Sequence, residues 1–152
     1  KREKYFASSE CINSDFWSHI AENTDSKFIM FTHCTNPLLK VETYNKIINY
    51  FLQKKSNNDS INTVTDVKEF LYLKNKPLNF NPNKSPNSQN LPNIVKINFA
   101  VTIISKKLMA QKKTLMGKKP IFYKLDEIEG HDINTNFEFN YAEYLYKKYL
   151  KL

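Results

Sequence analysis

The side chains that could perform nucleophilic or metal chemistry are few, and their spacing argues against several kinds of active site. Three histidines, His19, His33 and His131, have no serine or cysteine partner in a recognisable nucleophile turn. The two cysteines, Cys11 and Cys34, lack metal-ligand spacing, and one possible disulfide is not the pattern of a secreted scaffold. We therefore expect two reduced, buried thiols in a cytoplasmic protein.

Four other polar residues flank predicted strands or turns and carry groups that could contact a substrate. His33 ends an apolar run and can donate or accept a hydrogen bond according to its tautomer, whereas Asn98 can do both at once. Asp132 and Asn134 follow a turn at Gly130, and alternate positions of an extended segment place two side chains on the same edge. A plain structural interpretation stays open beside this one. His33 then merely ends a strand, and Asn98 and Asp132 serve a turn or a cap.

A net charge of +8 raises the alternative of a nucleic-acid-binding module. The basic residues are almost all lysine, with Arg2 as the single arginine, and phosphate clamps and base readout favour arginine. Three lysine doublets, 106–107, 112–113 and 118–119, could contact phosphates. No aromatic residues are interleaved with them as stacking platforms, and a solvated helix face explains them as well. Nucleic acid is therefore the less favoured partner.

Hydrophobic periodicity predicts a crossover unit in the first half of the chain. A helix is expected at 14–21, followed by a continuous apolar strand at 28–31 that suits burial on both faces. A second helix at 44–52 has one apolar stripe, and a second strand is expected at 61–64. Strand, helix and strand in succession are typical of an α/β fold. No apolar stretch approaches the ~20 residues of a membrane span, so we expect a soluble protein.

The second half combines a polar excursion with further strands and helices. Residues 79–93 are dominated by Asn, Pro and Ser, which predicts a long loop outside the core. Loops of that length in a compact domain are usually functional or lie at an interface. The remaining predicted elements are strands at 70–73, 100–104 and 121–123, a short helix at 105–111, and a last helix at 137–150 with a broad aromatic face. The expected fold is a single α/β domain over residues 1–152.

Four stretches of the chain, in order, resemble the acylneuraminate cytidylyltransferase family, which makes CMP-activated sugars. Lys1-Arg2-Glu3 and the helix after it resemble the segment before the family's central strand. The second stretch, Phe28–Leu38 ending in His33-Cys34-Thr35-Asn36-Pro37-Leu38, resembles the family's strand and Q-P-T-S-P-L loop. The third, Gln89-Asn90-Leu91-Pro92 with Asn98 and the strand 100–104, resembles its Q-D-L-P and N-G-x-x-Y motifs. The fourth, Asp132-Ile133-Asn134 with residues 137–146, resembles its D-I-D segment and the D-F-x-x-A-E-x-L-Y helix that follows.

This resemblance implies a function and a set of site residues. The fold would be the C-terminal part of a Rossmann-like nucleotidyltransferase sheet with helices on both faces, and residues 65–93 would form a dimerisation insertion. The reaction would transfer CMP from CTP to a sugar in glycan biosynthesis. By resemblance, Asp132 and Asn134 would be the catalytic, Mg²⁺-binding pair, His33, Asn98 and Gln89 would contact the substrate, and the protein would be a homodimer.

Departures from the family's pattern lead us to expect that these 152 residues alone are inactive. The family's second metal-binding carboxylate is replaced by Asn134, its arginines before Q-D-L-P by Asn87 and Ser88, and its tyrosine by Thr102. Its glycine-rich nucleotide loop, which cradles the triphosphate, should precede Lys1. A second alternative is therefore a non-catalytic scaffold that keeps the fold and has lost the reaction.

Overall fold

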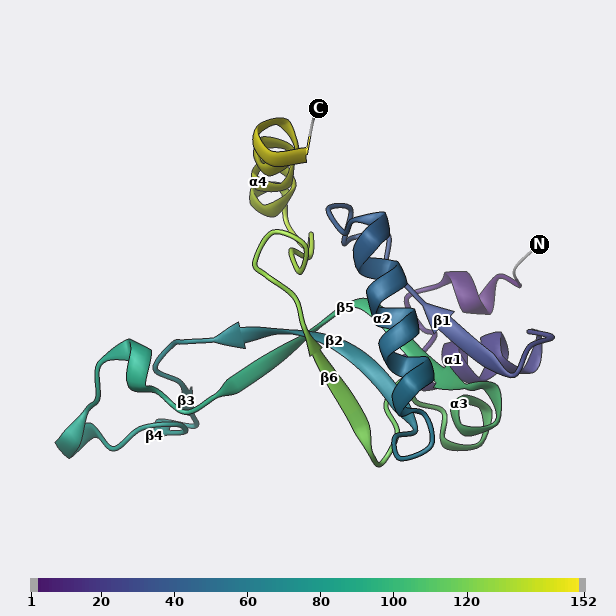
Figure 1. The fold of residues 1–152 in the computed structure, drawn as a ribbon, viewed down its shortest axis with the longest axis horizontal. Coiled ribbons are helices and arrows are strands. Elements are labelled where there is room, and N and C mark those ends of the chain that lie inside the picture. Colours follow the sequence, from purple (N-terminus) through teal and green to yellow (C-terminus); the bar gives the residue numbers. More distant parts are fainter. Residues whose placement is uncertain (1–2, 151–152) are drawn as a thin grey trace.

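A four-stranded sheet forms the centre of the protein, whose computed structural model describes residues 3–150 (Figure 1). Its strands lie in the order β1 (Phe28–Phe31), β5 (Ile94–Ser105), β2 (Ser60–Val67) and β6 (Pro120–Lys124). β2 and β6 pair in parallel, and β5 runs antiparallel to both of its neighbours, β1 and β2. β1, β2 and β6 therefore point the same way, and the side of the sheet where these three strands end is called its carboxyl edge below. The expected α/β class is confirmed. Lys1 and Arg2, part of the first stretch of the family resemblance, lie outside the described residues.

The burial of the strands corrects one expectation about the first strand. β1 is an edge strand, and its Met30 side chain is 45% exposed, so burial on both faces was a wrong prediction for 28–31. β2 instead has this character, because every residue from Ser60 to Thr65 is buried. β2 lies between two neighbours in the sheet and is covered on both faces, as continuous apolar strands usually are.

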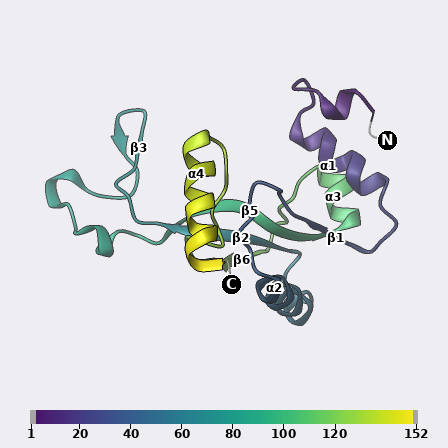
Figure 2. The ribbon, with the colours of Figure 1, turned by 90° about the horizontal axis from the view of Figure 1, so that it is seen from above.

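Helices cover both faces of the sheet, as expected (Figure 2). On one face, Ile47 and Phe51 of α2 (Val41–Lys54) pack against Ile61, Val101 and Ile103. The other face is covered by α1 (Asn13–Glu22), which follows the short 3-10 helix η1 (Tyr5–Ala7), and by α3 (Lys106–Lys112). There Ala21 of α1 and Met109 of α3 pack against Ile29 and Ile104 of the sheet. The two clusters bury the apolar stripes that the helix periodicity predicted.

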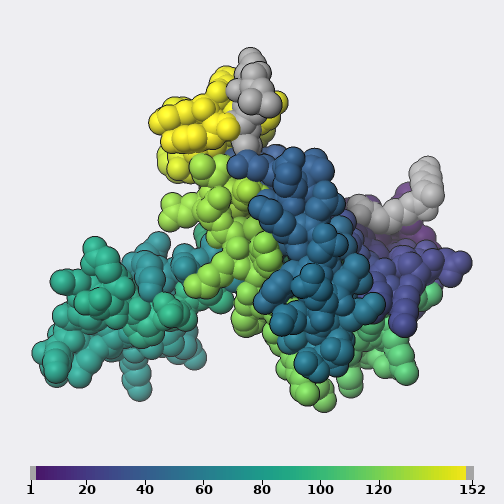
Figure 3. Space-filling view, viewed as in Figure 1, coloured from purple at the N-terminus to yellow at the C-terminus, as the bar shows by residue number. Residues whose placement is uncertain are grey.

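The segment between β2 and β5 projects from the sheet as an arm, which Figure 3 shows as a separate lobe. It holds a two-residue hairpin, β3 (Tyr72–Leu73) with β4 (Lys76–Pro77), and two 3-10 turns, η2 (Pro82–Lys84) and η3 (Ser88–Asn90). The irregular excursion is thus confirmed, and only two residues of the expected 70–73 strand pair. The insertion boundaries at 65–93 and its role in dimerisation stay predictions.

The last helix is shorter and more exposed than its aromatic pattern suggested. α4 (Asn136–Leu145) is capped by the Thr135 hydroxyl and continues into a π-helical turn, Tyr146–Leu150. Only Ala142 and Leu145 of α4 are buried, against Leu38 in the loop after β1. The large aromatics point away from this contact, and their exposure ranges from 45% for Tyr141 to 78% for Phe137.

A bulge in the central strand pair depends on the hydroxyl of Thr63. The β2–β5 register shifts between Asn62 and Val64, and Phe99 adopts a φ of 55°, a conformation uncommon outside glycine. Thr63 Oγ1 fills the bulge: it accepts from the Val101 N–H at 2.9 Å and donates to Asn98 Oδ1 at 2.7 Å. The hydroxyl therefore takes the place of a missing ladder bond.

Replacing Thr63 by Val keeps the shape of this side chain and removes the hydroxyl. Because the Val101 N–H would lose its acceptor in the core, we expect Thr63→Val to lower the free energy of unfolding by about 2 kcal/mol. Urea denaturation followed by circular dichroism measures this difference. Thr32→Val, at an exposed position, is the matched control and should change stability by less than about 0.5 kcal/mol. Equal stabilities of the two variants would contradict the role of the bulge bond.

Candidate functional site

Most of the predicted site residues lie at the edge where β1, β2 and β6 end. His33 follows β1 by two residues, Asp132 lies in the loop after β6, and Asn98 is in the first half of the antiparallel strand β5. Ligands of open α/β sheets bind outside the carboxyl ends of the parallel strands. The sheet topology therefore brings together residues that are up to 99 positions apart in the sequence.

Backbone and side-chain hydrogen bonds join the loop after β1 to the loop after β6. The Ile133 N–H donates to the Thr35 carbonyl at 2.9 Å, and Asn36 Nδ2 donates to the His131 carbonyl at 3.1 Å. A third link runs from the Lys40 N–H to the buried carboxylate of Glu129 at 3.3 Å. These bonds fix Asp132 relative to His33.

In the side-chain amide of Asn98, the oxygen is hydrogen-bonded within residues 3–150 and the nitrogen is not. Its Oδ1 accepts from the Thr63 hydroxyl at 2.7 Å and from the Ala100 N–H at 3.2 Å, which sets the orientation of the amide. Its Nδ2 is buried and has no hydrogen-bond partner among the described residues. A buried amide donor without a partner is costly in a folded protein, which makes this group a candidate to bind a ligand.

Asp132 is arranged in a similar way. Its Oδ2 accepts from Asn134 Nδ2 at 3.0 Å, while its Oδ1 is buried and lacks a partner within the described part of the chain. Asn134 is itself held by its backbone N–H, which donates to Glu138 Oε2 at 2.8 Å in the capping box at the start of α4. The N–H of Asn134 and the Thr135 hydroxyl hold the pKa of the Glu138 carboxyl below its usual value.

His33 is partly buried between aromatic rings and close to Asp132. Its ring stacks on Phe99 at a centroid distance of 5.3 Å and meets the edge of Phe31 at 5.1 Å. Burial lowers the pKa of the His33 imidazole, and the negative charge of Asp132 partly opposes this effect. Burial therefore favours the neutral imidazole, in which one ring nitrogen can accept a proton.

A cavity of about 250 Å³ lies at this edge, and Asp132 forms part of its wall. Among the described residues that line it are five carboxylates and one lysine, although the whole chain carries a charge of +8. The lining residues are Thr65, Asp66, Val67, Glu69, Lys96, Glu127, Gly130, His131, Asp132, Glu138 and Tyr141. The cavity is therefore acidic in a basic protein.

Of the predicted site residues, Asp132 lines the cavity, whereas His33, Asn98 and Asn134 lie at the same edge outside its lining, and one lining residue was missed. Gln89 is exposed in η3 on the arm and does not line the cavity, and Asn87 and Ser88 lie beside it. Thr102 is fully buried and accepts from Asn62 Nδ2 at 3.0 Å, so it serves the core. Thr65 was not predicted, because an alternating threonine in a strand gives no signal of its own.

The two cysteines are more exposed than the sequence suggested. Cys11 is half-buried and Cys34 is exposed, so the prediction of two buried thiols was wrong, and both are free thiols. Within residues 3–150, no three His, Cys, Asp or Glu side chains lie close enough together to hold a metal without further ligands. In the same range, no helix is long and apolar enough to cross a membrane.

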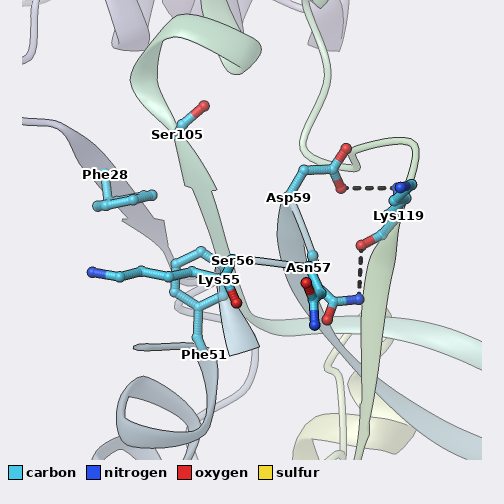
Figure 4. A pocket seen from close by; sticks show the side chains of 9 residues that line it. Phe28, Phe51, Lys55, Ser56, Asn57, Asp59, Ser105 and Lys119 are labelled. Carbon is cyan, nitrogen blue, oxygen red and sulfur yellow. Dashed lines mark hydrogen bonds between the residues drawn. The ribbon is translucent and has the colours of Figure 1, made fainter. Parts of the chain in front are cut away.

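A larger cavity of about 360 Å³ lies at the opposite edge of the sheet, where α2 ends and β2 begins (Figure 4). Its one acidic residue, Asp59, is already used: its two carboxylate oxygens accept from the N–H groups of Lys118 and Lys119 at 2.8 and 2.9 Å. None of the buried, unpartnered polar atoms of residues 3–150 belongs to its lining. The acidic cavity is therefore the better candidate site, despite its smaller volume.

No known protein family matches the sequence, and no curated protein is similar to it. The fold is nevertheless similar to solved structures. The 4-diphosphocytidyl-2C-methyl-D-erythritol synthase of Anaerococcus prevotii DSM 20548 matches with a TM-score of 0.60 and 14% identity, over 86% of this chain and 64% of that one. The bifunctional IspDF of Campylobacter jejuni matches with a TM-score of 0.60 and 15% identity, over 84% of this chain and 33% of that one.

These similarities establish a nucleotidyltransferase-like fold, and at such identities the fold alone. The chain spans less than two thirds of the length of either structure. The acylneuraminate cytidylyltransferase family is not confirmed, because no family matches the sequence.

The pKa of His33 provides a test of the site's geometry. Because the folded-state pKa lies below the unfolded value of about 6.5, the unfolded chain binds more protons between these two values, and stability should rise with pH through that window. The Asp132 charge raises this pKa, so Asp132→Asn should lower it further. An NMR titration of the His33 ring measures the shift, with the exposed Asp25→Asn as control. An unchanged or higher pKa in Asp132→Asn would show that the two side chains do not face each other.

Proposed function

We propose that this chain forms the acceptor-binding part of a CTP-dependent nucleotidyltransferase, which transfers CMP to a hydroxyl group of a sugar. The observation that carries the proposal is the buried, unpartnered Oδ1 of Asp132 at the carboxyl edge of a nucleotidyltransferase-like sheet. The unpartnered amide of Asn98 and the neutral imidazole of His33 lie at the same edge and support it. The name of the similar Anaerococcus prevotii structure, a 4-diphosphocytidyl-2C-methyl-D-erythritol synthase, agrees with cytidyl chemistry.

The residues at this edge fit a Mg²⁺ ion that is bound together with the nucleotide. Mg²⁺ commonly takes one or two carboxylates and completes its shell with phosphate oxygens and water. Asp132 Oδ1 can be such a ligand, because no protein donor in the described residues competes for it. Asn134 donates to the other carboxylate oxygen and so orients Asp132. When bound, the ion would neutralise charge on the phosphates of CTP.

Each of the chain's own side chains then has a distinct part in the reaction. Asn98 Nδ2 donates a hydrogen bond to an oxygen of the acceptor sugar, which positions it. The free ring nitrogen of His33 accepts the proton of the acceptor hydroxyl as that oxygen attacks the α-phosphate and pyrophosphate leaves. Asp132 raises the pKa of His33 and so favours the protonated imidazole that results.

The proposal places the triphosphate-binding residues outside this part of the protein. The sequence contains two glycines, Gly117 and Gly130, and neither lies in a loop that could cradle phosphates after a first strand. The acidic cavity would itself repel CTP in the absence of a divalent cation. We therefore expect the 152-residue chain alone to bind the cation without turning over CTP.

Metal binding at Asp132 tests the proposal. Mn²⁺ should broaden the amide NMR signals of residues 130–134, and Asp132→Asn should abolish this effect. Asn134→Ala, which removes the orienting hydrogen bond, should weaken Mn²⁺ binding about 10–100-fold. Asp25→Asn is the control for a charge removed elsewhere.

The catalytic part of the proposal is tested on the protein as the cell produces it. That protein should release pyrophosphate from CTP when Mg²⁺ and a sugar acceptor are present, and Asp132→Asn should lower kcat. Binding of Mn²⁺ that survives Asp132→Asn would refute the metal site. Absence of pyrophosphate release with intact Mn²⁺ binding would favour the scaffold alternative.

We also propose that the arm forms a homodimer contact. Its hairpin region exposes Tyr72, Leu73 and Leu78 at 58–60% of their surface, which is unfavourable in a free monomer. A dimer would also allow Gln89 to approach the site of the second subunit. Light scattering should give twice the chain mass for the wild type and a monomer for the double variant Leu73→Glu, Leu78→Glu. Asn83→Asp, elsewhere on the arm, should remain dimeric, and a monomeric wild type would contradict the proposal.

A further inference from the structure

The acidic cavity contains a second unpartnered polar group, which no part of the reaction described above uses. Thr65 lines the cavity and is 4% exposed, and its Oγ1 is buried without a partner among the described residues. Two residues earlier on the same strand, the Thr63 hydroxyl makes bonds to Val101 and Asn98. The two threonines share residue type, strand and burial, so the free hydroxyl of Thr65 is not explained by the requirements of β2.

Thr65 and Asn98 both lie close to the backbone of Gly130, and Gly130 and Thr65 line the cavity. A Cβ atom on Gly130 would lie 2.4 Å from Thr65 Cγ2 and 2.8 Å from Asn98 Nδ2. The turn that ends at Gly130 therefore closes directly over two side chains whose polar atoms lack partners. This turn is held by Asp126, whose Oδ1 accepts from the N–H groups of Ile128 and Glu129 at 2.9 and 2.8 Å. Both polar atoms are buried, so a ligand reaches them only when this turn moves.

The charge around this point restricts what can bind there. Glu69, Glu127, Asp132 and Glu138 contribute negative charge to the lining. Asp66 is neutralised in part by Lys124 at 2.8 Å, and Lys96 is the one basic residue among the described lining residues. An anionic group in a cavity of this sign is repelled over a distance of about 8 Å at physiological salt.

We infer that Thr65 Oγ1 and Asn98 Nδ2 form a subsite for the hydroxyl groups of an acceptor that carries no carboxylate or phosphate, such as a neutral sugar or polyol. The inference rests on the proposed function and specifies its acceptor. Thr65 can donate to and accept from a ligand hydroxyl, and Asn98 donates to its oxygen. The carboxylates that line the cavity accept hydrogen bonds from further hydroxyl groups of the ligand, and their charge disfavours sugar acids.

Direct binding to the 152-residue chain, without CTP, tests the subsite separately from catalysis. The probes are glucose and sorbitol, with glucuronate and glucose 6-phosphate as the matched anions, each titrated in an NMR experiment that follows residues 65, 98 and 130. We expect glucose or sorbitol to shift these signals and to bind at least about tenfold more tightly than either anion. Addition of salt should leave the neutral probes unaffected and should strengthen binding of the anions.

The substitution Thr65→Val identifies the group responsible. Because its hydroxyl has no hydrogen-bond partner among residues 3–150, Thr65→Val should unfold at the same temperature as the wild type or a higher one, while affinity for the neutral probe falls about five- to tenfold. Thr114→Val, whose hydroxyl bonds within its own turn near Met116, is the control and should bind normally. Gly130→Ala should hold the turn away from Thr65 and change the same NMR signals.

The outcomes separate this inference from the proposed function. Tighter binding of glucuronate or glucose 6-phosphate than of the neutral probes would overturn the inference and leave a cytidylyltransferase with an acidic acceptor. Absence of binding by all four probes, or unchanged affinity in Thr65→Val, would also overturn it. Neutral-probe binding that depends on Thr65 would support the subsite even if the complete protein released no pyrophosphate from CTP.

Discussion

The hydrogen bonds of one buried hydroxyl, that of Thr63, connect the central strand pair to the candidate site. Without its bond to the Val101 N–H, the bulge in β5 would leave a buried backbone donor unpaired. The same hydroxyl donates to Asn98 Oδ1 and thereby turns the Asn98 amide so that Nδ2 remains free. The bulge also gives Phe99 its positive φ, and the Phe99 ring then supports His33 by stacking. Strained backbone of this kind persists only where surrounding contacts determine it.

The periodicity of the sequence predicted the helices and strands well, but it did not predict which of them pack or pair with each other. The apolar stripe of α2 can be predicted because burial of one helix face leaves a period of 3.6 in the sequence. The position of β1 at the edge could not be predicted, since it depends on β5 inserting between β1 and β2 after an arm of about 26 residues. Similarly, α4 has an aromatic pattern that predicts a broad packed face, but one stripe of the helix meets Leu38 and the rest stays exposed.

The candidate site shows the same limit at the level of single residues. Asp132 and His33 were chosen by family resemblance and chain order, and the sheet does bring them to one edge. The hydrogen bond from Asn134 to Asp132, by contrast, depends on the capping box at Thr135 and Glu138, which fixes the loop locally. Thr65 could not be found at all, because its importance lies in a missing bond. A sequence shows which groups exist, and only the fold shows which of them have no partner.

The separation of charge gives the cavity its chemical character. A protein with a charge of +8 attracts anions in general, yet the residues that β2, β6 and α4 bring to this edge are mainly carboxylates. A carboxylate in such a group costs less when a cation is bound, which is why we propose that a divalent ion binds here together with CTP. The same carboxylates accept hydrogen bonds from hydroxyl groups without a charge penalty. In our proposal the cation and the acceptor take different oxygens of the cavity wall, so that one set of side chains would bind the cation and exclude anionic acceptors.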